Sequence, residues 1–210
     1  MNIAIFGAGN VGSALGGRLA AAGHTIVYGV RDPGSERARA AVASTGHGAQ
    51  AVTEAEAASS SDAIILAVPF SAAEDALKAA GDLTGRIILD ATNSLKPDLS
   101  GLDVPAAGSA GEEIAVLVPG AHVVKIFNTT GFGNMADPVY DGKPSAMFYA
   151  GDDAAAKQVA HELAAAVGFE PIDAGSLSNA GLLEAVAMLW IHLAYKGGLG
   201  RDFAFDIARR

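Results

Sequence analysis

The stretch that decides the fold is IFGAGNVG, residues 5–12. It carries the spacing G-x-G-x-x-G, follows an apolar run at residues 2–6 and opens an alanine-rich helical pattern at residues 13–22. In this setting Gly7 permits a tight turn, Gly9 lets a pyrophosphate approach the backbone, and Gly12 lets the helix pack closely on the strand. The motif therefore predicts a dinucleotide held by backbone N–H groups at a helix N-terminus.

Strands and helices alternate along the chain after this motif. Short apolar runs rich in β-branched residues predict strands, and helical patterns follow those at residues 2–6, 25–29 and 63–67. Such alternation is typical of crossover connections and of a parallel sheet covered by helices on both faces. We therefore expect an α/β fold, a Rossmann-like doubly wound parallel sheet with a small C-terminal helical extension. The expected strands are residues 2–6, 25–29, 50–53, 63–67, 86–90 and 123–127.

The chain divides into two expected regions near residue 150. Residues 1–150 are expected to form the nucleotide-binding Rossmann domain, and residues 151–210 a smaller α/β and helical segment that completes the ligand cleft. A strand–helix–strand pattern spans the boundary, and its helix is expected to be capped by Asp152 or Asp153. This pattern consists of residues 145–150, 153–167 and 169–172, and we expect it to extend the same sheet.

The last helical pattern, residues 177–195, is apolar on nearly all sides and opens with Ser178 or Asn179 as a cap. A helix without a polar stripe is normally buried on more than one side. Because little chain remains to cover it, we predict that a second subunit does so and that the protein is a homodimer.

Composition narrows the class of protein. The chain has 210 residues, no cysteine and a formal net charge of -9, so its surface is expected to repel nucleic acid and anionic lipid. The lack of cysteine excludes disulfides and thiolate catalysis and fits a reducing compartment. The apolar stretch 180–195 is shorter than the ~20 residues that span a bilayer, and no export signal opens the chain. We expect a soluble cytoplasmic protein, and the scattered histidines predict no metal site.

The end of the second strand indicates which nucleotide is bound. An NAD enzyme normally places an acidic residue about 20 positions past the glycines, to bind the ribose 2′-hydroxyl. Here Val30 takes that position and Arg31 follows it. A guanidinium binds a 2′-phosphate, which a carboxylate would repel, so NADPH is favoured over NADH. Arg37 adds positive charge, whereas Asp32, if it points inward, would reverse the preference.

The ends of the later strands should face the same cofactor, because ligands of open parallel sheets lie beyond the carboxyl ends of strands. Pro69 and Phe70 would wall the nicotinamide, although Pro69 is also a common first residue of a helix. The later ends carry uncharged amides and hydroxyls, which suit a carboxamide or a polar heterocycle, but which also make turns. The cofactor-binding candidates are Gly7, Gly9, Asn10, Val11, Gly12, Val30, Arg31, Arg37, Ala67, Val68, Pro69, Phe70 and Asn93.

No side chain stands out as the proton donor that hydride transfer to a carbonyl normally needs. Lys125 and Lys196 are the lysines near expected ligand edges, and neither lies in a recognisable motif. His192, on an apolar helix, is expected in the core or at an interface. We therefore assign no catalytic residue and favour an acceptor that is itself a planar conjugated cofactor.

These residues resemble a family, the NADPH-dependent reductases of the deazaflavin coenzyme F420, which are similar in turn to the NADPH-binding domain of membrane metalloreductases. The resemblance covers nearly the whole chain and rests on four stretches: residues 5–12, VYGVR at 27–31, KIFNT at 125–129, and DAGSLSN at 173–179. It implies reversible hydride transfer between NADP(H) and coenzyme F420 stacked on the nicotinamide. It further implies that the acceptor lies against Asn128, Thr129, Thr130, Leu177, Ser178 and Asn179.

Two alternatives stay open. The chain has Val30 where the F420 reductases carry a hydroxyl residue, and its Phe127-Asn128-Thr129 is closer to the metalloreductase domain, whose acceptor is a flavin. A soluble NADPH reductase of flavin, quinone or a small carbonyl is therefore the first alternative. The second is an NADP(H)-binding protein without catalysis.

Overall fold

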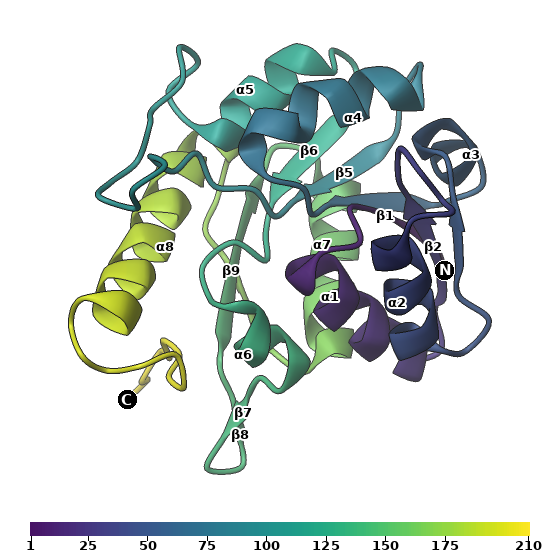
Figure 1. Ribbon diagram of the computed structural model, residues 1–210. Coiled ribbons are helices and arrows are strands. Elements are labelled where there is room, and N and C mark those ends of the chain that lie inside the picture. The colour runs from purple at the N-terminus through teal and green to yellow at the C-terminus, as the bar shows by residue number, and fades with distance from the viewer.

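The computed structural model describes residues 1–210 and contains one eight-stranded sheet with helices on both faces (Figure 1). Six strands run parallel in the order β3-β2-β1-β4-β5-β6, which is the Rossmann order. The strands are β1 (Asn2–Phe6), β2 (Thr25–Gly29), β3 (Gln50–Val52), β4 (Ala63–Leu66), β5 (Ile87–Asp90), β6 (His122–Lys125), β9 (Ala146–Gly151) and β10 (Glu170–Asp173). The predicted fold class is confirmed.

Eight helices surround this sheet, and two short 3-10 turns precede the fourth and the eighth. The helices are α1 (Asn10–Ala21), α2 (Glu36–Thr45), α3 (Glu54–Ser59), α4 (Ala73–Ala80), α5 (Ala110–Leu117), α6 (Phe132–Ala136), α7 (Ala154–Val167) and α8 (Ala180–Tyr195), with the 3-10 turns η1 (Phe70–Ala72) and η2 (Leu177–Asn179). Asp153 caps α7 by accepting the Ala156 N–H at 2.8 Å, as predicted, whereas neither Ser178 nor Asn179 caps α8 with its side chain.

The sheet departs from the parallel pattern at β9, which pairs antiparallel with β6. A further parallel strand would need a crossover that returns the chain to the end of the sheet at which the parallel strands begin. The chain after β6 contains only α6 and the hairpin of β7 (Val139–Tyr140) and β8 (Lys143–Pro144). A five-residue helix is about 7.5 Å long, too short to cross the sheet, so β9 itself carries the chain back. Strand β10 then pairs parallel with β9 across α7, which places both in the one sheet, as expected.

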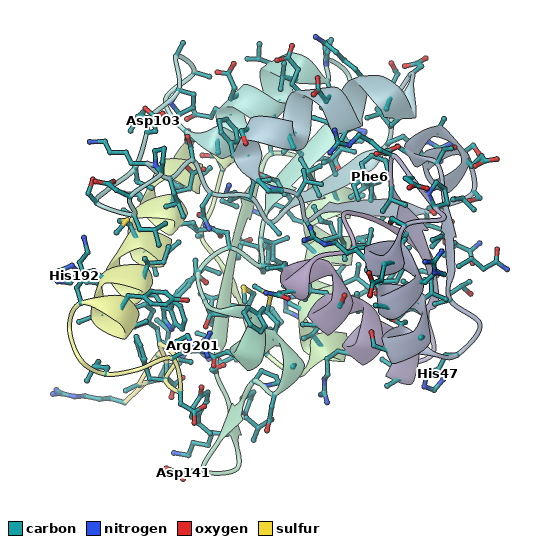
Figure 2. The ribbon with its side chains drawn as sticks, viewed as in Figure 1. Phe6, His47, Asp103, Asp141, His192 and Arg201 are labelled. Carbon is teal, nitrogen blue, oxygen red and sulfur yellow. The ribbon has the colours of Figure 1, made fainter.

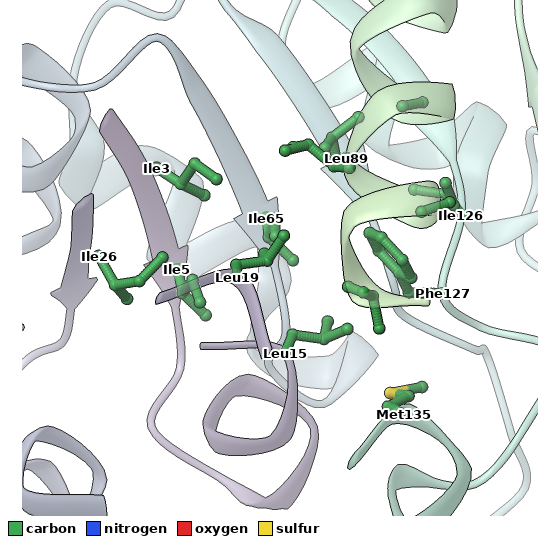
Figure 3. Close-up of a cluster of buried hydrophobic side chains, with 14 of the residues drawn as sticks. Ile3, Ile5, Leu15, Leu19, Ile26, Ile65, Leu89, Ile126, Phe127 and Met135 are labelled. Carbon is green, nitrogen blue, oxygen red and sulfur yellow. The ribbon is translucent and has the colours of Figure 1, made fainter. Parts of the chain in front are cut away.

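Side chains of the central strands alternate between two hydrophobic cores. Ile3 and Ile5 of β1 face the core under α1, α2, α6 and α7, whereas Ala4 and Phe6 face the core under α3, α4 and α5. Figure 3 shows the first core, in which Leu15 and other residues of these elements meet. The strands are apolar on both faces because both faces are covered. The expected boundary at residue 150 falls inside β9 of this shared sheet.

Helix α8 packs on α5 and β9 along one face and leaves the other face exposed. Leu182 is 66% exposed and Leu189 50% exposed, and His192 points away from the body, so it is not a core histidine (Figure 2). Residues 177–195 form a stretch long and apolar enough, by length and composition alone, to cross a membrane. Core helices of soluble proteins have the same composition, and this one carries the buried Glu184.

Candidate functional site

The glycine loop between β1 and α1 is shaped as the motif predicts. Gly7 has a φ of 107°, and a Cβ there would lie 2.6 Å from the Ala67 carbonyl oxygen. A Cβ on Gly12 would lie 2.1 Å from the Gly7 carbonyl oxygen. A Cβ on Gly9 would meet nothing within 4 Å. The first and third glycines are therefore required by the protein itself, whereas the second leaves open space for a ligand.

The N-terminus of α1 offers unpaired backbone donors to that space. The first bond of the helix runs from the Ser13 N–H to the Gly9 carbonyl at 2.9 Å, so the N–H groups of Asn10, Val11 and Gly12 have no intrahelical partner. Gly9 is the N-cap and provides no side chain to satisfy them. Such donors at the positive end of a helix bind phosphate.

A cleft of about 490 Å³ lies beside this loop, at the carboxyl ends of β1, β2 and β4. It brings together eight of the predicted cofactor residues: Gly7, Gly9, Val30, Arg31, Arg37, Ala67, Val68 and Pro69. Asn10 lines a neighbouring hollow, which Gly9 and Arg37 share. Phe70 lies in η1 directly after Pro69, and so Pro69 both edges the cleft and starts the turn that leads into α4.

The far end of the cleft carries the positive charge. Arg31 and Arg37 are exposed and form no ion pair, and Ser35, the N-cap of α2, lines the cleft between them. Asp32 lines the same cleft, where its Oδ1 accepts the Gly34 N–H at 2.9 Å. Glu54 and Asp75 are the other carboxylates in the lining. Two guanidinium groups and a helix N-terminus therefore provide local attraction for a phosphate in a chain of net charge -9.

The ends of β5 and β6 form a second, uncharged edge. The Asn93 amide donates to the Asn128 carbonyl oxygen at 3.0 Å, and the Asn128 amide donates to Asn93 Oδ1 at 3.0 Å. These reciprocal bonds fix both amides and leave the buried Asn128 Oδ1 without a partner. An unpaired buried oxygen costs about 1–3 kcal/mol, and an N–H donor of a ligand would remove that cost.

Backbone conformation at the same edge is strained. Phe127 is fully buried and has a φ of 61°, in the left-handed region that non-glycine residues rarely adopt. Strain of this kind costs about 1–3 kcal/mol and gathers at functional sites. The turn directs the chain into Asn128 and Thr129, both of which are buried.

Residues 177–179 are not brought to this edge. Strands β9 and β10 run antiparallel to β6, so the chain leaves β10 at the end of the sheet where β6 begins. Leu177 is buried near Gly111 and Lys125, and Ser178 is exposed. The structure therefore separates these three residues from Asn128, Thr129 and Thr130. The family resemblance had implied that both segments line one acceptor cleft.

A second cleft, of about 440 Å³, was missed by the sequence reasoning and lies between α6, the β7–β8 hairpin and α8. It begins at Gly131, directly after Thr130, whose Oγ1 accepts a hydrogen bond from Asn134 Nδ2 at 2.7 Å. Its aromatic and charged lining comes from Phe132, Tyr140, Trp190, Tyr195, Asp137, Arg201 and Asp202. The only sequence signal for this region is the Asp-Gly turn at residues 141–142, which is typical of a hairpin.

The titratable groups near these sites are hydrogen-bonded, paired or exposed. Burial, together with the charges of Asp202 and Asp137, raises the pKa of Tyr140, so its hydroxyl stays protonated and donates to Asn134 Oδ1 at 2.7 Å. Lys125 does not face a cleft, because its side chain is fully buried and paired with carboxylates. Lys196 is exposed at the end of α8. No three His, Asp or Glu side chains group as a metal site.

Comparisons with a family model, with curated proteins and with solved structures all find F420-dependent NADP reductases or oxidoreductases. The family model described as "NADP oxidoreductase coenzyme F420-dependent" matches residues 2–94. The F420-dependent NADP reductase of Methanothermobacter marburgensis is 31% identical, over 93% of this chain and 93% of its own. A solved structure from Arthrobacter sp. FB24, provisionally named an F420-dependent NADP reductase, superposes with a TM-score of 0.87 at 31% identity and covers 99% of both chains.

A further relative is a larger protein. The rat metalloreductase STEAP3 is 31% identical over 89% of this chain, which spans only 36% of the rat protein. The imine reductase of Streptomyces aurantiacus superposes with a TM-score of 0.66 at 21% identity, and so shares the fold. The chain belongs to the coenzyme F420-dependent NADP oxidoreductase family and is an NADP(H)-dependent oxidoreductase.

Proposed function

We propose that this protein transfers a hydride between NADP(H) and the deazaflavin coenzyme F420. The observation that carries the proposal is the 490 Å³ cleft, which unites the glycine loop with the unpaired Arg31 and Arg37. The F420-dependent names of two relatives that match nearly the full chain supply the acceptor. Residues 1–150 would then bind NADPH, and residues 151–210 would complete the acceptor cleft through α8.

The glycine loop, the cleft and the ends of β5 and β6 each have a defined task in this proposal. The N–H groups of Asn10, Val11 and Gly12 hold the pyrophosphate, and Arg31 and Arg37 hold the 2′-phosphate. Val68 and Pro69 wall the nicotinamide, which supplies the hydride when the cofactor is bound. Asn128 Oδ1, which has no partner in the protein, accepts an N–H from the nicotinamide carboxamide.

The acceptor is proposed to lie between the Asn128–Thr130 edge and α8, where the second cleft begins. Rate then depends on stacking two rings at reacting distance rather than on a side-chain acid. Arg201 and the aromatic lining of this cleft would bind the remainder of the acceptor. Leu177, Ser178 and Asn179 lie away from this edge and would act only through the position of α8.

A flavin is the second candidate acceptor, favoured by the 31% identity to a metalloreductase over most of the chain. The direct test mixes the protein with NADPH and purified coenzyme F420 and follows the loss of visible deazaflavin absorbance. Parallel reactions contain FMN, FAD, a quinone and a small carbonyl. Turnover of F420 alone supports the proposal. Turnover of a different acceptor with none of F420 would refute it, and NADPH binding without any turnover would indicate a non-catalytic binding protein.

We further propose a cytoplasmic homodimer in which α8 is covered by α8 of a second copy. Leu182 and Leu189 lie seven residues apart, on the same side of the helix, and both are largely exposed in the single chain. Exposed apolar faces of this kind commonly mark protein contacts.

A further inference from the structure

An ionic cluster lies inside the fold, next to the uncharged edge of the site. Lys125 Nζ lies 2.9 Å from Asp90 Oδ2 and 3.0 Å from Glu184 Oε1, and it donates to the Thr92 carbonyl oxygen at 2.5 Å. The side chains of Lys125 and Asp90 are 0% exposed and that of Glu184 is 3% exposed. An ammonium has three N–H donors, and here three acceptors surround it, two from β5 and the loop directly after it and one from α8.

On one side, the cluster holds the loop that follows β5 and carries Asn93. Asp90 Oδ1 accepts the Thr92 N–H at 2.9 Å, while Lys125 takes the Thr92 carbonyl, so both backbone polar groups of Thr92 are fixed by the cluster. The next residue, Asn93, makes the reciprocal amide bonds with Asn128. The cluster therefore fixes the position of the Asn93–Asn128 pair relative to the ends of β5 and β6.

On the other side, the cluster holds α8, which forms one wall of the proposed acceptor cleft. The Glu184 carboxylate accepts the N–H groups of Ala110 and Gly111, each at 3.1 Å, and so occupies the N-terminus of α5. Glu184 belongs to α8, whose Trp190 packs so tightly on Gly131 that a Cβ there would lie 2.5 Å from the indole ring. The Lys125 ammonium thus connects the loop after β5 with α8, on the opposite side of the proposed acceptor cleft.

We infer that Lys125, Asp90 and Glu184 are positioning residues that fix the separation between the nicotinamide edge and α8 for hydride transfer. This inference rests on the proposed function of the same site. Its effect on NADPH affinity is expected to be small, because the contacts proposed for the phosphates come from the glycine loop and the 490 Å³ cleft, which none of these three residues lines. Only the carboxamide hydrogen bond proposed for Asn128 depends on the cluster. Stability alone does not explain the cluster, since well-packed apolar residues often replace buried ion pairs without loss of stability.

The test compares Glu184→Gln with the double variant Lys125→Met/Glu184→Gln. The double variant keeps the formal charge of the cluster at -1, because one lysine and one carboxylate are removed together. In both variants we expect kcat to fall by about tenfold or more, with the Kd for NADPH raised by no more than about fivefold, the loss of one hydrogen bond. We also expect a larger primary isotope effect on kcat with NADPH deuterated at the transferred position, and faster hydrogen exchange at the Thr92 amide.

Lys157→Met is the matched control, because it removes a different lysine, paired with Asp173 at 2.8 Å on the outer strand β10. Unchanged kcat and isotope effect in the folded cluster variants would overturn the inference, as would an equal loss of kcat in the control. Failure of every cluster variant to fold would assign the cluster to stability and overturn it too. If the native protein turns over a different acceptor, the proposed function fails, and the same comparison is made with that acceptor.

Discussion

A methyl group at Gly12 would lie 2.1 Å from a backbone oxygen, and backbone cannot move aside as a flexible side chain can. We predict that Gly12→Ala displaces α1 from β1, lowers the unfolding free energy by about 1–3 kcal/mol and abolishes measurable NADPH binding. Denaturant unfolding and fluorescence titration provide the measurements.

Gly17→Ala is the matched control in the same helix, because a Cβ there meets nothing within 4 Å. That variant should gain about 0.5–1 kcal/mol and bind NADPH normally. If Gly12→Ala binds NADPH as well as the native protein, the close packing of loop and helix is not required for the cofactor.

Arg31 decides the nucleotide at the scale of one side chain. It is exposed, unpaired and placed in the cleft with Arg37 and the start of α2. We predict that Arg31→Ala raises KM for NADPH by about 10–100-fold, as expected for loss of a charged hydrogen bond of 1.5–3 kcal/mol, and changes KM for NADH by less than about threefold. Steady-state kinetics with both nucleotides measure this.

Arg209→Ala removes an arginine paired with Glu170 on the exposed surface and should leave both KM values unchanged. Equal increases for NADPH and NADH after Arg31→Ala would contradict the 2′-phosphate assignment. They would instead favour Asp32, which lines the same cleft, as the residue that contacts the ribose.

At the scale of elements, α8 presents an apolar face that the single chain leaves uncovered. We predict that Leu182→Asp/Leu189→Asp converts a homodimer into a monomer, because each buried leucine contributes about 1.5–3 kcal/mol and each aspartate would have to be desolvated. Light scattering after gel filtration measures the mass. Val104→Asp, on an exposed loop residue, is the control. A native protein that is already monomeric would contradict the prediction.

The elements that the sequence predicted are those with strong periodic patterns. Strands β1 and β2 have the predicted bounds, and α7 begins at the predicted cap. Helix α6 and the β7–β8 hairpin were missed because five- and two-residue elements carry no measurable period. The hairpin still had a local signal, since Asp141 and Gly142 both have positive φ, as a type I′ turn requires.

At the scale of the whole molecule, a net charge of -9 opposes an anionic cofactor, so binding depends on local donors. We predict that NADPH at one hundred times its Kd raises the melting temperature by roughly 5–10 °C, from about 2.7 kcal/mol of added stability. NADH at the same concentration should raise it by less than half as much. Thermal unfolding with each nucleotide measures this, and equal shifts would show that the 2′-phosphate is not recognised.

The sequence by itself determined the Rossmann-like strand–helix alternation, the glycine loop and the position of Arg31 after the second strand. Each depends on residues that are close in the chain, where spacing and residue type restrict the backbone directly. Only the tertiary structure decided the direction of β9, the separation of Leu177 from Asn128, and the contact of Lys125 with Asp90 and Glu184. These depend on which distant segments pack together, and the short connection after β6, not a local motif, fixed that packing.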